Sequence, residues 1–240
     1  MRTFVIADAH GYPELIENAL RHGEFHPGED NFVFAGDLLD RGPDAESCLG
    51  LVERYATEVL FGNHEAAVLL GFPILPQNPA SLHFRPLFFD KLFHPQPVPW
   101  KTASCVEGVL ITHAGVSRAW SRVFRGSCRS NPRRLADHLN EQFFEAVLEA
   151  IETSAGEWSD AGILGYDGPL WFRPNRFGGG ALPGCTQIAG HTPPSGFEPE
   201  RDLYLIDPDT SMGLDDSGRF RYALVVDGVV TVVEGSLSRP

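Results

Sequence analysis

Polar side chains with metal-binding chemistry follow several apolar runs in this sequence. Together they offer carboxylate, amide and imidazole donors without a cysteine, a combination that suits two borderline or hard divalent ions such as Mn, Fe or Zn. Residues two apart in an extended segment point to one side, so Asp8 and His10 can hold the same ion. The full set of candidate metal ligands is Asp8, His10, Asp37, Asn63, His113 and His191.

Each candidate alone has a simpler interpretation. Asp8 can cap a turn, Asn63 can cap its helix, and a lone histidine such as His113 is more often a hydrogen-bonded core residue than a ligand. Coincidence explains the joint pattern poorly, because Gly-Asp, Gly-Asn-His-Glu, Thr-His-Ala-Gly and Gly-His-Thr-Pro each follow a strand-like run. The joint pattern therefore favours one shared site.

The first 70 residues contain the elements that must position these side chains. An apolar strand, a polar cluster and an amphipathic helix occur three times in succession, a pattern typical of parallel α/β units. Pro13 and Pro43 are each expected to open a helix, while Gly62-Asn-His-Glu65 leads directly into "AAVLL". The clusters are spaced by 37 − 8 = 29 and 63 − 37 = 26 residues, about one strand-helix-strand unit. All three then lie at strand carboxyl ends, where open α/β sheets bind ligands.

Seven prolines interrupt the aromatic-rich stretch from Phe72 to Pro99. A long helix is excluded there, so we expect a largely irregular segment with a short helix near Leu87 to Phe93. The segment is either a packed connector or a wall over the cleft that shapes substrate choice.

The later part of the chain predicts one long helix and several short strands. Asn131 can cap a helix with Pro132 at its first position, and "TQIAG", "LYLID", "YALVV" and "VVTVV" read as strands. Asp227-Gly228 is a type I′ hairpin signal. We expect a second, more antiparallel sheet from this region. The residues expected to face the core from the long helix are Leu135, Leu139, Phe143, Val147 and Ile151.

Composition is typical of one globular domain spanning residues 1–240, with 42% hydrophobic and 21% charged residues. A net charge of −13 opposes nucleic acid polymers and anionic membranes as partners. The start already resembles a strand and not a leader, so a cytoplasmic protein is expected. Four widely spaced cysteines suggest neither a zinc ribbon nor a redox pair: Cys48, Cys105, Cys128 and Cys185.

The motifs "DAHG", "GDLLDRG", "GNHE", "HAG" and "GHTP" occur in this order between Asp8 and His191. Together they resemble the signatures of the calcineurin-like metallophosphoesterases, and within them the phosphoprotein phosphatase branch. The "HAG" form is similar both to bacterial-type serine/threonine phosphatases and to symmetrical dinucleoside tetraphosphate hydrolases. The resemblance implies an α/β (α+β) fold, a two-sheet β sandwich flanked by helices in four layers.

The resemblance also implies a division of the candidate ligands. Asp8, His10 and Asp37 would bind the first metal. Asp37 would bridge to a second metal held by Asn63, His113 and His191. Two divalent ions are implied, with Mn expected and Fe or Zn as alternatives. A hydroxide bridging the two metals would attack phosphorus in line.

Further roles follow from the same resemblance. His64 would protonate the leaving oxygen, with Asp40 orienting its ring, and Arg41 would bind the phosphate. Arg173 in "PLWFRPNR" is expected as the second phosphate-binding arginine, with Arg176 as the alternative. Asp44 is left as a first-turn carboxylate favoured by the helix dipole.

The resulting expectation is a phosphatase that acts on phosphoserine, phosphothreonine or phosphotyrosine in proteins, or on a small phosphoester. The first alternative is a hydrolase of symmetrical dinucleoside polyphosphates such as diadenosine tetraphosphate. A binding protein that has lost catalysis is a further alternative, which the complete set of ligands and the acid disfavour. The sequence leaves the oligomeric state open and is consistent with a monomer.

Overall fold

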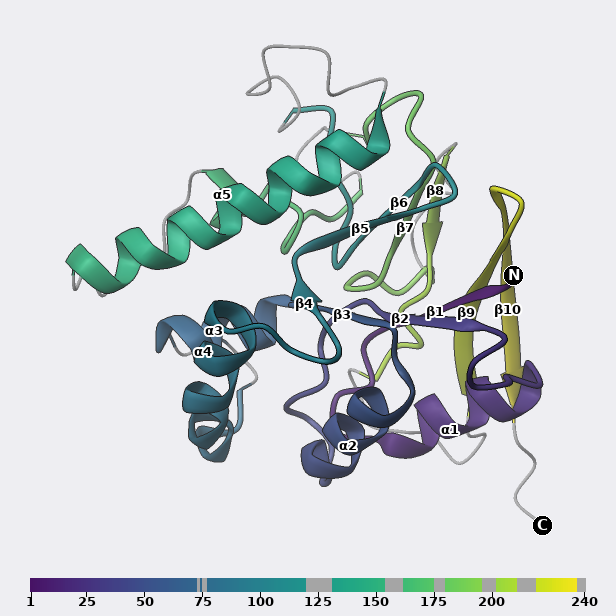
Figure 1. Ribbon diagram of the computed structural model, residues 1–240, viewed down its shortest axis with the longest axis horizontal. Coiled ribbons are helices and arrows are strands. Elements are labelled where there is room, and N and C mark those ends of the chain that lie inside the picture. Colours follow the sequence, from purple (N-terminus) through teal and green to yellow (C-terminus); the bar gives the residue numbers. More distant parts are fainter. Residues whose placement is uncertain are drawn as a thin grey trace.

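The computed structural model describes residues 1–72, 74, 77–119, 131–153, 162–174, 180–195, 202–210 and 219–236. Two β-sheets lie face to face in it (Figure 1). The six-stranded sheet has the order β10-β9-β1-β2-β3-β4, and the four-stranded sheet has the order β5-β6-β7-β8. The strands of the first sheet are β1 (Thr3–Ile6), β2 (Asn31–Phe34), β3 (Glu58–Leu60), β4 (Trp100–Lys101), β9 (Arg219–Val226) and β10 (Val229–Ser236).

The three predicted strand-helix units are confirmed. β1, β2 and β3 pair in parallel, and they lead into α1 (Pro13–His22), α2 (Ala45–Tyr55) and α3 (Asn63–Leu70). The expected start of α2 at Pro43 is wrong, as is the first-turn place of Asp44. Asp44 is instead the N-cap residue, and its Oδ1 accepts a hydrogen bond from the Ser47 N–H at 2.9 Å, which satisfies an otherwise unpaired helix donor.

The C-terminal hairpin joins the first sheet, so its expected place in a second, more antiparallel sheet is wrong. β9 pairs with β10 and with β1, both antiparallel. The type I′ turn is supported by positive φ angles of 50° at Asp227 and 74° at Gly228. The second sheet is mixed: β5 (Ala103–Val106) and β6 (Val109–Thr112) are antiparallel, whereas β6, β7 (Gln187–Ala189) and β8 (Leu203–Leu205) are parallel.

Alternation along β1 builds the layers, since successive side chains point to opposite faces of a sheet. Phe4 and Ile6 belong to the apolar cluster shared with α1, while Val5 and Ala7 belong to a cluster shared with β6 and β7. Helix α5 (Pro132–Thr153) packs on β5 and β6 of the second sheet. Figure 1 shows α1 and α2 on one side of the molecule and α5 on the other. The predicted two-sheet sandwich flanked by helices is therefore confirmed.

Most of the predicted apolar stripe on α5 faces the core. Leu135, Leu139, Phe143 and Val147 are at most 2% exposed. Ile151 is 43% exposed, so its expected core contact is wrong. Ile151 lies in the last turn of α5, whose end extends to the left beyond the sheets in Figure 1. Asn131 Oδ1 accepts from the Arg134 N–H at 3.2 Å, as expected of a cap.

The proline-rich segment is more ordered than expected among its described residues. A 3₁₀ helix, η1 (Pro79–Phe84), leads directly into α4 (Arg85–Phe93), which begins two residues before the expected short helix. Prolines stand at the first turn of both elements, where a missing N–H leaves no helical bond unmade. The segment is thus a packed part of the fold.

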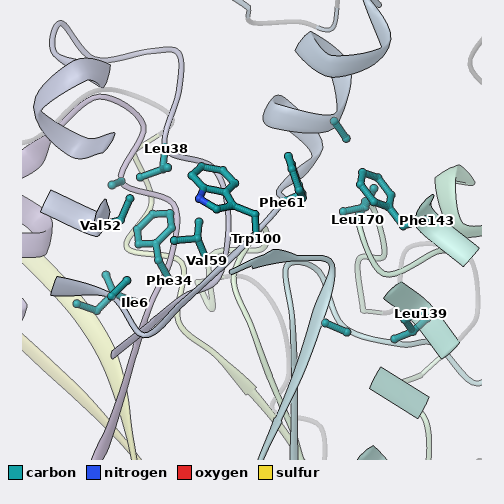
Figure 2. Packing of buried hydrophobic residues seen from close by; sticks show 14 of the residues in the cluster. Ile6, Phe34, Leu38, Val52, Val59, Phe61, Trp100, Leu139, Phe143 and Leu170 are labelled. Atoms are coloured by element: carbon teal, nitrogen blue, oxygen red, sulfur yellow. The ribbon is translucent and has the colours of Figure 1, made fainter. Parts of the chain in front are cut away.

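An aromatic cluster fixes the end of β3, just before Asn63. The ring of Phe61 lies 5.3 Å from that of Trp100 and 5.4 Å from that of Phe143 of α5. Figure 2 shows Phe61 beside Trp100, with Phe143 beside Leu170. Large aromatic contacts of this kind restrict backbone movement, so the loop that follows Phe61 starts from a rigid point.

Cys48, Cys105 and Cys185 are buried free thiols. Burial raises the pKa of Cys185 to about 11, which keeps this thiol protonated and unreactive. Cys128 lies outside the described residues. Within the described part of the chain, the helices are too short or too polar to span a bilayer.

Candidate metal centre

The candidate ligands lie together at the carboxyl ends of strands from both sheets. Asp8 and His10 follow β1, and Asp37 follows β2. Asn63 is the first residue of α3, directly after β3 and its short loop. The second sheet contributes the residues that follow β6 and β7. All six side chains belong to residues at most 5% exposed: Asp8, His10, Asp37, Asn63, His113 and His191.

The carboxylate of Asp37 lies at the centre of this cluster. Its Oδ2 is 3.3 Å from Nε2 of His10, 3.4 Å from Nε2 of His113 and 3.9 Å from Nε2 of His64. Asp8 Oδ1 lies 4.0 Å from His10 Nε2. In the described part of the chain, two groups of His and Asp residues have ligand atoms close enough to hold a metal ion, and both contain Asp37. These groups are His10, Asp37 and His64, and Asp37, His113 and His191.

The second group is completed by contacts between the two sheets. His113 Nε2 lies 2.9 Å from Asn63 Oδ1. The backbone N–H of His191 donates to both carboxylate oxygens of Asp8, at 3.0 and 2.9 Å. The rings of His113 and His191 meet edge to face at 5.1 Å. Residues separated by more than 180 positions thus form one compact cluster.

The orientation of the imidazoles suits metal binding. Nδ1 of His10 bonds to the Leu39 carbonyl at 2.7 Å, and Nδ1 of His113 bonds to the Ala35 carbonyl at 2.9 Å. When Nδ1–H donates to a carbonyl, the neutral ring presents its Nε2 lone pair, which is how ligating histidines are commonly held. The Nε2 atoms of His10 and His191 are buried and have no hydrogen-bond partner among the described residues. An inward lone pair with no donor beside it fits a cation.

The charges in the cluster also favour a bound cation. Burial, followed by the charge of Asp207, raises the pKa of Asp8 well above its ordinary value. Burial also raises the pKa of Asp207 to about 6. Burial would lower the pKa of His113, but with no cation bound the charge of Asp37 raises it to about 9, so a metal ion on Nε2 would have to take the place of that proton. Buried carboxylates need compensating charge, and divalent ions would supply it.

Left-handed backbone is concentrated in this site. Six functional candidates have φ angles between 44° and 69°, a region that residues other than glycine adopt rarely and at a cost in energy. Such strain persists where surrounding contacts enforce it and is frequent at functional sites. These residues are Asp8, His10, Asp37, Asp40, Arg41 and His191.

Two glycines allow the loops to approach this closely. A Cβ atom on Gly62 would lie 2.1 Å from Oδ1 of Asp37, and one on Gly190 would lie 2.0 Å from Oδ2 of Asp8. Both distances are far below van der Waals contact. The "GNHE" and "GHTP" motifs therefore need glycine first because a carboxylate occupies the space of a side chain.

Glu65 supports the site in a way that the sequence analysis missed. This fully buried carboxylate accepts four backbone hydrogen bonds. Oε2 accepts from the N–H groups of Asp37 and Gly62, at 2.8 and 2.9 Å, and Oε1 accepts from those of Leu38 and Leu39, at 2.8 and 3.3 Å. The sequence did contain one indication of this role: Glu65 stands in the first turn of α3, at the position from which a glutamate bonds back to the N-cap N–H. Glu65 thereby joins the loops after β2 and β3.

We expect Glu65→Ala to lower the free energy of unfolding by about 3 kcal/mol or more, because it leaves several buried N–H groups unpaired. Urea unfolding followed by circular dichroism measures the change. Glu46→Ala is the control, since Glu46 lies in the first turn of α2 with its side chain 82% exposed; its effect should stay within about 0.5 kcal/mol. Equal effects of the two substitutions would contradict this role.

His64 forms a buried pair with Asp40. Nδ1 of His64 makes a short hydrogen bond to Oδ2 of Asp40, and both residues are 2% exposed. Burial alone would lower the pKa of His64, but the charge of Asp37 and the hydrogen bond and charge of Asp40 raise it above its ordinary value. The pair therefore favours a protonated ring.

The two described arginines that were predicted to bind phosphate have different contacts. Arg41 is exposed, and its Nη1 donates to Oγ1 of Thr210 at 3.1 Å. Arg173 Nη1 donates to the His191 carbonyl at 2.8 Å, which brings Arg173 beside the candidate ligands. Arg176 lies outside the described residues. The hydrogen bond between Arg41 and Thr210 could not be predicted from the sequence, because it joins positions 169 apart.

Comparison with known proteins relates this site to phosphoester chemistry. The chain is 39% identical over 66 residues to serine/threonine-protein phosphatase 1 of Salmonella typhimurium, a match to 28% of this chain and 31% of that protein. It is 26% identical over 147 residues to the symmetrical bis(5′-nucleosyl)-tetraphosphatase of Haemophilus influenzae, covering 58% and 53% of the two chains. The chain thus spans less than two thirds of either relative.

A solved structure shares the fold. The cold-active protein-tyrosine phosphatase of a psychrophilic Shewanella superposes with a TM-score of 0.65 and 16% identity, over 98% of this chain and 80% of the other. The family profile described as "Calcineurin-like phosphoesterase" matches residues 1–175, which include five of the six candidate ligands. This chain belongs to the calcineurin-like phosphoesterase family.

Proposed function

We propose that this protein is a metal-dependent phosphatase that removes phosphate from phosphoserine or phosphothreonine in proteins, with phosphotyrosine as a further substrate. The observation that carries the proposal is the position of the Asp37 carboxylate, which lies within 3.4 Å of Nε2 of both His10 and His113. The His64–Asp40 pair lies next to it. This arrangement supports the proposal, because phosphoester hydrolysis of this kind needs cation ligands and a proton donor close together.

The described side chains divide into two ligand sets. Asp8, His10 and Asp37 would hold one ion, and Asp37 would share a second with Asn63, His113 and His191. When bound, two divalent ions lower the pKa of a water molecule to make the nucleophile, and they offset charge on the phosphate. Mn is the expected metal, with Fe or Zn as alternatives, because nitrogen and oxygen donors accept all three.

The remaining polar residues would act on the leaving group and on the phosphate. Nε2 of His64 would donate a proton to the departing oxygen. Asp40 bonds to the opposite nitrogen and so fixes the direction of Nε2. The guanidinium groups of Arg41 and Arg173 would each bind phosphate oxygens, where their planar donors stabilise charge that grows in the transition state.

A second candidate function is hydrolysis of symmetrical dinucleoside polyphosphates. It is favoured by the longer match, over 147 residues, to a tetraphosphatase. The higher identity of 39% to a protein phosphatase supports the first candidate. Both would use the same metal ligands, so the substrates must be compared directly.

The protein should be stripped of metal, reloaded with Mn, and assayed in parallel on phosphoserine, phosphothreonine and phosphotyrosine peptides and on diadenosine tetraphosphate. We expect kcat/KM for at least one phosphopeptide to exceed that for the nucleotide by about ten-fold or more, a difference of about 1.4 kcal/mol in transition-state binding. Rapid nucleotide cleavage beside negligible peptide turnover would instead establish the second candidate. No turnover of any phosphoester or phosphoanhydride with Mn, Fe or Zn would identify a binding protein.

A further inference from the structure

The side chain of Asp40 has a second set of contacts besides its bond to His64. Its Oδ1 accepts a hydrogen bond from the Ser81 hydroxyl at 2.5 Å and another from the backbone N–H of Asn78 at 2.8 Å. Oδ2 bonds to His64 Nδ1. One oxygen of Asp40 therefore bonds to the proline-rich segment, and the other bonds to His64.

The groups that contact Oδ1 are themselves held in place. Ser81 is 5% exposed, and its N–H donates to the Asn78 carbonyl at 2.8 Å. Asn78 Oδ1 caps η1 by accepting from the Ala80 N–H at 3.0 Å. The first turn of η1 therefore presents a hydroxyl and an N–H in a fixed direction.

The same segment is attached to the helix that carries His64. Arg85, at the junction of η1 and α4, donates from Nε to the Leu69 carbonyl of α3 at 3.0 Å. Phe84 and Phe88 are 7% and 0% exposed and belong to the main apolar cluster. Helix α3, which carries His64, is therefore joined through Arg85 and the apolar cluster to η1, which contacts Asp40.

Asp40 needs such support because its backbone is strained, with a φ angle of 69°. A carboxylate with one oxygen unbound can rotate about its terminal torsion, which is broad for aspartate. Two donors on Oδ1 remove that freedom and keep Oδ2 on the imidazole. We infer that Ser81 is a positioning residue for the acid: its hydroxyl holds Asp40 in the orientation that aims His64 at the leaving oxygen.

This inference rests on the proposed function and extends it to a residue that none of the recognised motifs contains. It also gives a role to the proline-rich segment, which the sequence left as either a connector or a wall. The turn from Asn78 to Ser81 is thereby part of the machinery that positions the proton donor, through its two hydrogen bonds to Asp40.

The test compares two substrates of the Mn-loaded protein: a phosphoserine peptide, whose alkoxide is a poor leaving group, and 4-nitrophenyl phosphate, whose phenolate leaves without a proton. We expect Ser81→Ala to lower kcat for the peptide by about ten-fold, the effect of one hydrogen bond to a charged group. KM for both substrates and kcat for 4-nitrophenyl phosphate should change by less than about two-fold. Ser81→Thr keeps the hydroxyl and should restore peptide turnover.

Further comparisons distinguish positioning from general damage. Ser104→Ala removes another serine hydroxyl, from a residue of β5 that is also 5% exposed, and should leave both substrates unaffected. In a His64→Asn background, Ser81→Ala should cause no additional loss, because the group it positions is gone. Thermal unfolding checks that each variant is folded.

An equal loss on both substrates, or a loss that persists in the His64→Asn background, would overturn the positioning role. So would full peptide turnover in Ser81→Ala. Absence of turnover by the unmodified protein on both substrates would overturn the proposed function itself, which separates the two failures. If Ser81→Ala does not fold, Ser81→Thr still decides the matter, since the inference requires near-normal kcat from a folded variant that keeps the hydroxyl.

Discussion

Asp37→Asn is expected to lose binding of both metal ions and to lower kcat/KM by about a thousand-fold or more. The carboxylate Oδ2 lies within 3.4 Å of a nitrogen from each ligand group, so one lost charge affects both positions. Asparagine is the appropriate replacement because it has the same shape and tolerates the left-handed backbone at φ 63°. Its Oδ1 can also keep the hydrogen bond from the His64 N–H, 3.1 Å long.

Elemental analysis after gel filtration measures the number of bound ions, and isothermal titration calorimetry with Mn measures their affinity. We expect the affinity for Mn to fall by more than about a hundred-fold, which exceeds the loss typical when a residue that only hydrogen-bonds to a metal ligand is replaced. Asp44→Asn is the matched control: it makes the same chemical change in the same loop, and asparagine also caps helices well. Two ions retained in Asp37→Asn would show that its carboxylate is not shared between them.

His64→Asn is expected to keep both ions and to lower kcat by about a hundred-fold to ten-thousand-fold on substrates with poor leaving groups. Since Nδ1 of His64 is bonded to Asp40, Nε2 is the nitrogen that can donate a proton to the leaving oxygen. The same Nε2 lies 3.9 Å from Asp37 Oδ2, close enough for His64 to be counted in a ligand group with His10. Metal content therefore decides between proton donor and ligand.

Turnover of a phosphoserine peptide and of 4-nitrophenyl phosphate should be measured together with metal content. His138→Asn is a suitable control, because His138 lies on α5 with its side chain 36% exposed. A loss of one ion in His64→Asn would assign the residue to the metal centre. Equal losses on the two substrates with both ions retained would argue against proton donation.

Local patterns predicted the parts of this fold that depend on short stretches of chain. Apolar runs followed by polar clusters gave the three strand-helix units, and their regular spacing indicated parallel pairing, as between β1 and β2. The convergence of Asp8, Asp37 and Asn63 followed from that pairing, because parallel strands end at one edge. The positions of these site residues were thus predictable from the sequence.

Features that depend on contacts between distant segments were not predictable. The C-terminal hairpin shows the correct turn at Asp227, but its partner strand, β1, lies more than 200 residues away in sequence. Asp44 differs from a first-turn residue only by where the helix begins, which sequence patterns locate poorly. The sequence around Glu65 indicates at most its bond back to Gly62, and Ser81 looks like an ordinary helix residue until the side chain of Asp40 is placed against it.

Because both sheets contribute ligands to one centre, metal binding should affect how much of the protein is folded, in addition to its catalytic rate. Ions held by Asp8 and Asp37 on one sheet and by His113 and His191 on the other would bind the folded chain and not the unfolded one. Thermodynamic linkage then raises the free energy of unfolding by about 1.4 kcal/mol for every ten-fold excess of ion over its dissociation constant. If the ions bind as proposed, a larger share of this protein would be unfolded where the metal is scarce.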